Sequence, residues 1–98
     1  MKILYSPRSL RDLAAIRDFI TEESGNRKVA DNYIVRLLDA CDSLASLPER
    51  YSLYRFATGW RMMPFENYLV FFQVKNEEVR IGHFRHGARK PFRGQKQR

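Results

Sequence analysis

The chain has 98 residues, of which 44% are hydrophobic and 13% aromatic, and this is enough for one folded domain with one modest core. Its formal net charge is +7. Residues 79–98 contain seven bases and no acid, so the other 18 − 7 = 11 bases balance all 11 acids. A neutral body with a basic end is typical of a solvated tail, a nucleic-acid arm or a site for an acidic partner.

Histidine and cysteine are scarce, and this limits the chemistry that we expect. The single cysteine, Cys41, excludes an internal disulfide and fits a reducing compartment. His83 and His86 are the two histidines, and neither stands at zinc-site spacing from Cys41. We therefore expect no metal and no cofactor. The N-terminus lacks the apolar run of a signal peptide and no stretch has the length of a membrane span, which predicts a cytoplasmic protein.

The first half of the chain predicts a short strand followed by a helical hairpin. Residues 2–5 are a strand candidate, and a helix begins after Ser6, which can cap it, with Pro7 in its first turn. Gly25 and Asn26 supply the stop. The next helix, of about twenty residues, has apolar residues spaced by three and four up to Pro48. Cys41 lies in that apolar stripe, so we interpret it as a core residue.

The second half predicts strands. Residues 52–56 are a weak candidate, residues 60–65 a better one, and residues 67–74 and 78–84 are strong candidates joined as a hairpin at 75–78. The order strand, helix, helix and then three or four strands predicts an α+β fold in which the helical hairpin covers one face of a small antiparallel sheet.

The strand at 68–74 carries apolar residues on both of its faces, because side chains alternate along a strand. One helical hairpin covers only one face, so we expect an exposed apolar patch on the other. A partner protein would cover this patch, or the N-terminal strand and the tail would fold back over it. The first face comprises Tyr68, Val70, Phe72 and Val74, and the patch comprises Leu69 and Phe71 with Trp60 or Phe84.

These elements and a set of residues resemble the ParE branch of the RelE/ParE toxin superfamily, from bacterial type II toxin-antitoxin modules. The resemblance implies a RelE-like βααβββ fold over residues 1–90. From the charge distribution, we expect residues 91–98 to form a basic, flexible tail. The resemblance also implies a cognate antitoxin whose acidic, amphipathic C-terminal segment inactivates the toxin. The toxin would form a hetero-oligomer with this antitoxin or a homodimer. The residues that carry the resemblance are Trp60-Arg61, Tyr68 at the start of an apolar strand, Val79 and Ile81, and then His86 and Arg89.

The resemblance implies two surfaces. For a ParE-like toxin it implies growth inhibition by binding to DNA gyrase, without enzymatic activity. The target-binding residues would be Trp60, Arg61, His86, Arg89 and Arg93. The antitoxin-binding residues would be Leu69, Phe71, Phe84, Arg85 and Arg89.

Two alternatives remain open. A RelE-like toxin would be a ribosome-dependent, metal-independent endoribonuclease that uses Arg61, His86 and Arg89. The strand at 67–74, however, offers Leu69, Val70, Phe71 and Phe72, which cannot transfer protons. A non-toxic interaction domain of the same fold is the other alternative.

Overall fold

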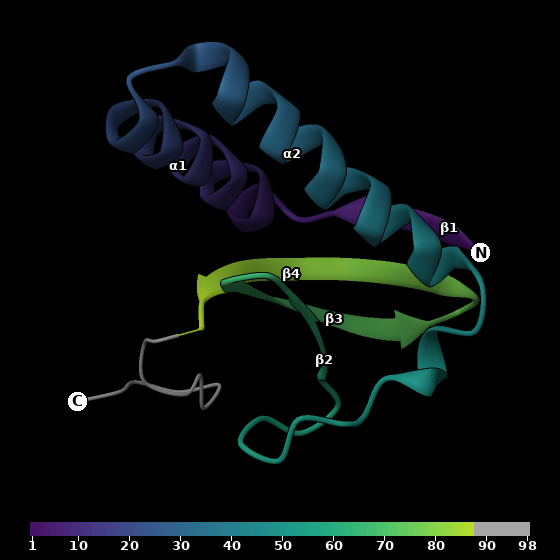
Figure 1. Ribbon diagram of the computed structural model, residues 1–98. Helices are drawn as coiled ribbons and strands as arrows, with labels where there is room; N and C mark the ends of the chain where they lie inside the picture. Colours follow the sequence, from purple (N-terminus) through teal and green to yellow (C-terminus); the bar gives the residue numbers. More distant parts are fainter. Residues whose placement is uncertain (88–98) are drawn as a thin grey trace.

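Two helices lie across one face of a four-stranded sheet in the computed structural model, which describes residues 1–87 (Figure 1). The basic segment 88–98 lies outside the described residues. The elements, in chain order, are β1 (Lys2–Tyr5), α1 (Pro7–Ser24), α2 (Arg27–Asp42), the short 3₁₀ helices η1 (Ser43–Ala45) and η2 (Pro48–Arg50), β2 (Arg61–Phe65), β3 (Tyr68–Lys75) and β4 (Glu78–His86).

The strand order in the sheet is β1-β4-β3-β2. The pairs β2–β3 and β3–β4 are antiparallel, whereas β1 runs parallel to β4, with Ile3 opposite Val79. The predicted α+β fold is therefore confirmed. The expectation of a purely antiparallel sheet is wrong, because β1 joins as an edge strand parallel to β4 and makes the sheet mixed. The chain between these two parallel strands runs through α1, α2, β2 and β3.

The helix boundaries follow the predicted caps. Ser6 Oγ accepts a hydrogen bond from the Ser9 N–H at 2.9 Å, and Gly25, at a φ of 67°, donates its N–H to the Thr21 carbonyl. Asn26, expected only as part of the stop of the first helix, also caps the second. The expected length of about twenty residues for that helix is wrong, because α2 has 16 residues and ends at Asp42. The hydroxyl of Ser43 donates to the Ala40 carbonyl, and the chain tightens into a 3₁₀ turn.

The strand predictions are confirmed except for residues 52–56. Asn76 and Glu77 have φ of 52° and 59°, as a two-residue hairpin turn between β3 and β4 requires. Residues 52–56 contribute only a bridge between Leu53 and Arg61. Backbone hydrogen bonds close turns around this segment, among them Tyr54 N–H to the Trp60 carbonyl at 2.7 Å.

A bulge in β4 changes which side chains face the helices. Phe71 pairs with His83 and Phe72 pairs with Ile81, so Gly82 is an extra residue between the two pairs. Strict alternation would place Phe84 on the face opposite the helices, as the sequence suggested. The bulge turns Phe84 toward the helices instead, where 5% of it is exposed. The expected place of Phe84 in an outer patch is therefore wrong.

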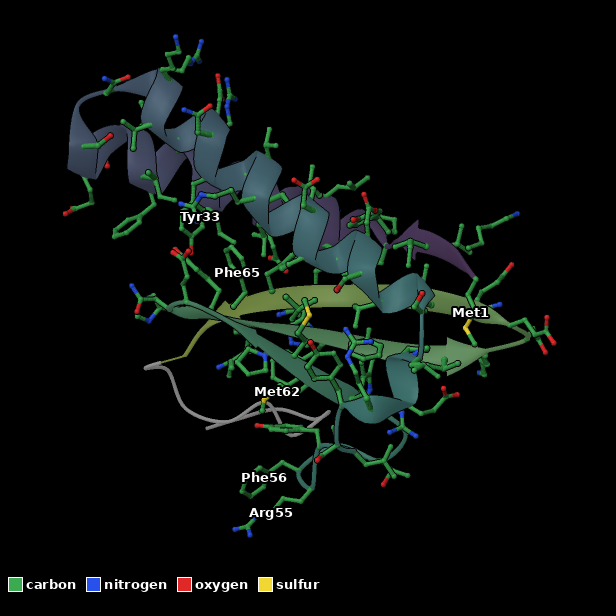
Figure 2. The ribbon with its side chains drawn as sticks, turned by 45° about the vertical axis from the view of Figure 1, so that its right-hand side comes forward. Met1, Tyr33, Arg55, Phe56, Met62 and Phe65 are labelled. Carbon is green, nitrogen blue, oxygen red and sulfur yellow. The ribbon has the colours of Figure 1, made fainter. Side chains whose placement is uncertain are left out.

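The main core lies between the helices and the sheet. The predicted stripe residues Leu37 and Cys41 are completely buried in it. Burial raises the pKa of the Cys41 thiol to about 12, so this cysteine is a core residue and not a nucleophile. Figure 2 shows one edge of this interface, where Tyr33 of α2 lies against Phe65 of β2 with the ring centroids 5.7 Å apart.

Candidate functional site

The face of the sheet opposite the helices, called here the outer face, is covered in part by residues 51–60. Phe71 is completely buried on this face, stacked on His83 at 4.7 Å between ring centroids and edge-on to Tyr54 at 4.9 Å. The prediction that Phe71 belongs to an exposed patch is therefore wrong, because the connection before β2 folds over it. At the tip of this connection, Arg55 and Phe56 lie away from the sheet (Figure 2), with the guanidinium 4.8 Å from the ring centroid.

Trp60 lies directly on the bulge of β4. A Cβ atom added to Gly82 would lie 2.2 Å from Cη2 of the Trp60 ring, so the indole occupies space that only a glycine leaves. The ring is also 6.0 Å from the His83 ring. Trp60 is half-buried, and we conclude that it anchors the end of segment 51–60 whatever else it binds.

Arg61 holds the beginning of the same segment. Its Nη1 donates to the Tyr51 carbonyl at 2.7 Å and to the Glu49 carbonyl at 3.3 Å. These bonds join β2 to the backbone that leaves η2, and a half-buried guanidinium satisfied in this way fixes that backbone. The guanidinium thus has a structural role.

His83 is inside the structure and is not a surface residue. Only 2% of it is exposed, and burial, with smaller contributions from the positive charges of Arg8 and Arg85, lowers its pKa to about 4. A neutral imidazole packed between Phe71 and Trp60 acts as part of the outer-face core at neutral pH. Strict alternation would place His83 on the helix side with Ile81, whereas the extra residue Gly82 places it on the outer face against Phe71.

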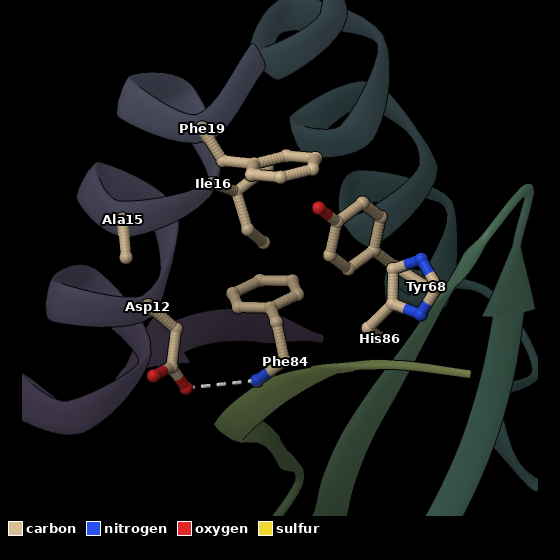
Figure 3. Close-up of a pocket in the computed structure, with 7 residues that line it drawn as sticks. All are labelled: Asp12, Ala15, Ile16, Phe19, Tyr68, Phe84 and His86. Atoms are coloured by element: carbon tan, nitrogen blue, oxygen red, sulfur yellow. Dashed lines mark hydrogen bonds between the residues drawn. The ribbon is translucent and has the colours of Figure 1, made fainter. Parts of the chain in front are cut away.

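His86, at the end of β4, lines a small cavity on the helix side of the sheet. The cavity has a volume of about 160 Å³ and lies between α1 and the ends of β3 and β4 (Figure 3). The His86 ring lies edge-on to Tyr68, with centroids 5.3 Å apart. Asp12 Oδ2 accepts the Phe84 N–H at 3.0 Å, which joins α1 to β4 beside the cavity (Figure 3). The lining residues are Asp12, Ala15, Ile16, Phe19, Tyr68, Phe84 and His86.

Sequence reasoning missed most of this cavity. Asp12 and Phe19 lie seven residues apart on α1 and so share a face of that helix, which is the signal that could have indicated a common site. The cavity contains an imidazole, a phenol and a carboxylate, which are groups able to carry protons. Among residues 1–87, those that line it include no lysine or arginine.

The structure does not bring Arg61 and His86 together. Arg61 pairs with Phe72 and His86 pairs with Tyr68, so they lie four positions apart along β3, or about 13 Å at 3.3 Å per residue. Leu69 and Arg85 do meet, as register partners on the outer face. Arg89 and Arg93 lie outside the described residues.

Within residues 1–87, no three histidine, cysteine or acidic side chains are grouped so that they could hold a metal ion. None of the helices in that range is long and apolar enough to cross a membrane.

Residues 3–91 match the family described as "ParE toxin of type II toxin-antitoxin system, parDE". The chain belongs to the ParE toxin family. This confirms the resemblance expected from the sequence, and membership of a toxin-antitoxin family implies a cognate antitoxin as partner.

One curated protein and one solved structure are similar to this chain over most of their lengths. "Toxin RelE2" of Caulobacter vibrioides is 36% identical over 88 residues, which cover 90% of this chain and 97% of the relative. A solved structure titled "Chromosomal ParDE TA system from P. aeruginosa" aligns with a TM-score of 0.79 over 88% of this chain and 95% of that one. Its sequence identity is 19%, so this second likeness bears on the fold alone.

Proposed function

We propose that this ParE family member inhibits DNA gyrase by binding, without cleaving RNA, and that its cognate antitoxin holds it inactive. The separation of Arg61 from His86 is the observation that carries the proposal. Metal-free RNA cleavage needs one group to activate the 2′-hydroxyl, one to protonate the leaving oxygen, and cations beside the phosphorane. Among the described residues, the candidate cation and the candidate proton carrier lie at different ends of the sheet.

The environment of each group supports the same proposal. The Arg61 guanidinium is used to bind two backbone carbonyls, and withdrawing it to bind a phosphate would release segment 51–60. The middle of β3 has no proton-transfer group, and both Phe71 and Phe72 are completely buried. A toxin that acts by binding needs a shaped surface and not a set of aligned reacting groups, so this arrangement does not hinder it.

The proposed gyrase-binding surface comprises the residues that the family resemblance indicated, and it falls into two parts. Trp60 and Arg61 lie at the end of segment 51–60, whereas His86 lies at the end of β4, from which the chain continues to Arg89 and Arg93. We propose the second part as the main contact, because Trp60 and Arg61 already have structural roles.

A RelE-like ribonuclease is the second candidate, and the name of the relative from Caulobacter vibrioides favours it. In this case Arg89 would have to supply the phosphorane contact near His86, since Arg61 is remote.

The test uses one preparation of the toxin, released from its antitoxin and refolded. We expect it to inhibit supercoiling by purified gyrase and to leave messenger RNA intact in a translation extract. A chain ending at Ala88 should lose inhibition and keep its melting temperature, because the deleted residues are terminal and, apart from Pro91, Phe92 and Gly94, polar. The matched control is Arg11→Glu, which alters an exposed charge on α1 and should inhibit like the parent.

Codon-dependent cleavage of messenger RNA with unaffected supercoiling would refute the gyrase proposal. If His86→Gln then abolished cleavage and Arg61→Ala left it intact, the ribonuclease centre would lie at the end of β4. A chain with neither activity would be the non-toxic alternative.

A further inference from the structure

The two edges of the sheet differ in how their backbone groups are used. At the β2 edge, Leu53 forms a bridge with Arg61, and the Met62 N–H donates to the Ser52 carbonyl at 3.4 Å. Pro64 on the same strand has no N–H to offer. At the β1 edge, no strand within residues 1–87 pairs with the outer side. An edge strand of this kind is a template for another strand.

The register with β4 shows which groups β1 directs outward. The Ser6 N–H donates to the Ile81 carbonyl at 3.0 Å, and alternate residues of a strand direct their backbone groups to the same side. Leu4 therefore also faces β4, whereas Ile3 and Tyr5 direct their N–H and C=O groups to the outer edge.

A groove on the outer face runs beside this edge. It has a volume of about 390 Å³, and its lining residues include Leu4, Ser6, Trp60, Gln73, Arg80 and Gly82. Leu4 is 39% exposed, although it stands in the sheet. The indole of Trp60 and the bare backbone of Gly82 give the groove an apolar wall that can accept an aliphatic side chain.

The charges around the groove are mainly positive. Lys2 is exposed on β1, and the Arg80 side chain remains 43% exposed while it pairs with Glu78 at 2.9 Å. The positive charges of Arg8 and Arg85 are close enough to His83 to contribute to its lowered pKa. A segment with apolar side chains and nearby carboxylates would complement both the groove and these bases.

We propose that the outer edge of β1 receives an extended, acidic segment of the cognate antitoxin, which pairs with Ile3 and Tyr5 and places an apolar side chain in the groove beside Trp60. Backbone hydrogen bonds would supply affinity, and the groove with Lys2 and Arg80 would supply specificity, as in strand-addition complexes. A second copy of the chain is a poor occupant, because its own edge strand, Lys2–Tyr5, carries a base and no acid and so cannot complement these positive charges. This inference rests on the antitoxin part of the proposed function and is independent of gyrase.

Amide exchange measured by NMR tests the pairing directly. In the toxin alone, the Ile3 and Tyr5 amides should exchange faster than that of Leu4, which is bonded to β4. In the complex with the full-length cognate antitoxin, both should slow at least tenfold beyond the slowing of Leu4. Unchanged exchange at Ile3 and Tyr5 in the complex would overturn the proposal, and so would concentration-dependent protection without antitoxin, which would make a second copy the occupant.

A pair of variants tests the chemistry of the groove. Arg80→Glu should weaken the complex at least tenfold, with a faster dissociation rate, while Arg11→Glu, on the exposed side of α1, should bind like the parent. Both variants should stay folded with melting temperatures close to that of the parent, because the Arg80–Glu78 ion pair is partly exposed and such pairs contribute little to stability. Equal affinities of the two variants would exclude the groove as an antitoxin site. Because no assay here involves gyrase, failure of the gyrase proposal would not be mistaken for failure of this one.

Discussion

The two faces of the sheet are both buried near their centres, but by different means. On the helix side, two regular helices place residues such as Leu37 and Cys41 against the strands. On the outer face, an irregular segment covers Phe71 through a few specific contacts. The comparison shows that an apolar strand face indicates burial without indicating what covers it. Phe71, which was expected on a surface that binds a partner protein, is instead buried against Tyr54 of the same chain.

The two faces should differ in local stability. Regular helix packing spreads the burial over many side chains, whereas the outer-face cover depends on the hydrogen bonds of Arg61 and the contact of Trp60 with Gly82. Units held by fewer contacts open at lower free energy. We therefore expect segment 51–60 to open before the helices separate from the sheet.

The largest expected effect is on the helix side. Leu37→Asp would place an unpaired carboxylate at a completely buried position of α2, and the cost should be roughly 3–5 kcal/mol or more, enough to unfold a marginally stable domain. Circular dichroism with thermal melting checks this. Val35→Asp is the matched control, because Val35 is 56% exposed on the same helix and should melt like the parent. A Leu37 variant that also melts normally would contradict the assignment of the main core.

A smaller effect, restricted to acid, is expected on the outer face. The pKa of His83 is about 4 in the folded state against 6.5 for an ordinary histidine, so the unfolded chain binds this proton more readily. The neutral ring therefore contributes stability that is complete above about pH 6.5 and is lost as the pH falls to about 4, on the order of 3 kcal/mol in total.

Urea unfolding of the parent and of His83→Phe at pH 7, 5.5 and 4.5 measures this loss. The free energy of unfolding of the variant should fall less between pH 7 and 4.5 than that of the parent. Identical pH dependence would mean that His83 is accessible to protons in the native state and that the outer-face core is open.

The smallest expected effect comes from the bulge. Gly82→Ala would put a Cβ atom 2.2 Å from the Trp60 ring and should destabilise the fold by about 1–3 kcal/mol as the ring is displaced. In a double-mutant cycle with Trp60→Ala, the Gly82 substitution should cost much less when the indole is absent. Urea denaturation measures the change in the free energy of unfolding caused by Gly82→Ala in the parent and in the Trp60→Ala variant. Additive effects would show that Trp60 does not rest on Gly82 in solution.

The comparison of the two faces also shows which site residues could be predicted from the sequence. Leu69 and Arg85, expected on one surface, are register partners on the outer face. Phe71 and Phe84, expected beside them, are buried on opposite faces. Leu4 and Arg80 were not considered, because their meeting with Trp60 depends on a parallel pairing between the two ends of the chain.

By itself, the sequence determined the elements of this protein and its family. Caps at Ser6 and Asn26, the helical spacing of apolar residues and the turn at 76–77 act over a few neighbouring residues, so they can be read locally. Only the tertiary structure decided which face each strand residue occupies after Gly82, what covers Phe71, and that β1 leaves an open edge. Those outcomes depend on contacts between residues distant in the chain, where a single extra residue in one strand reverses the side of every side chain that follows.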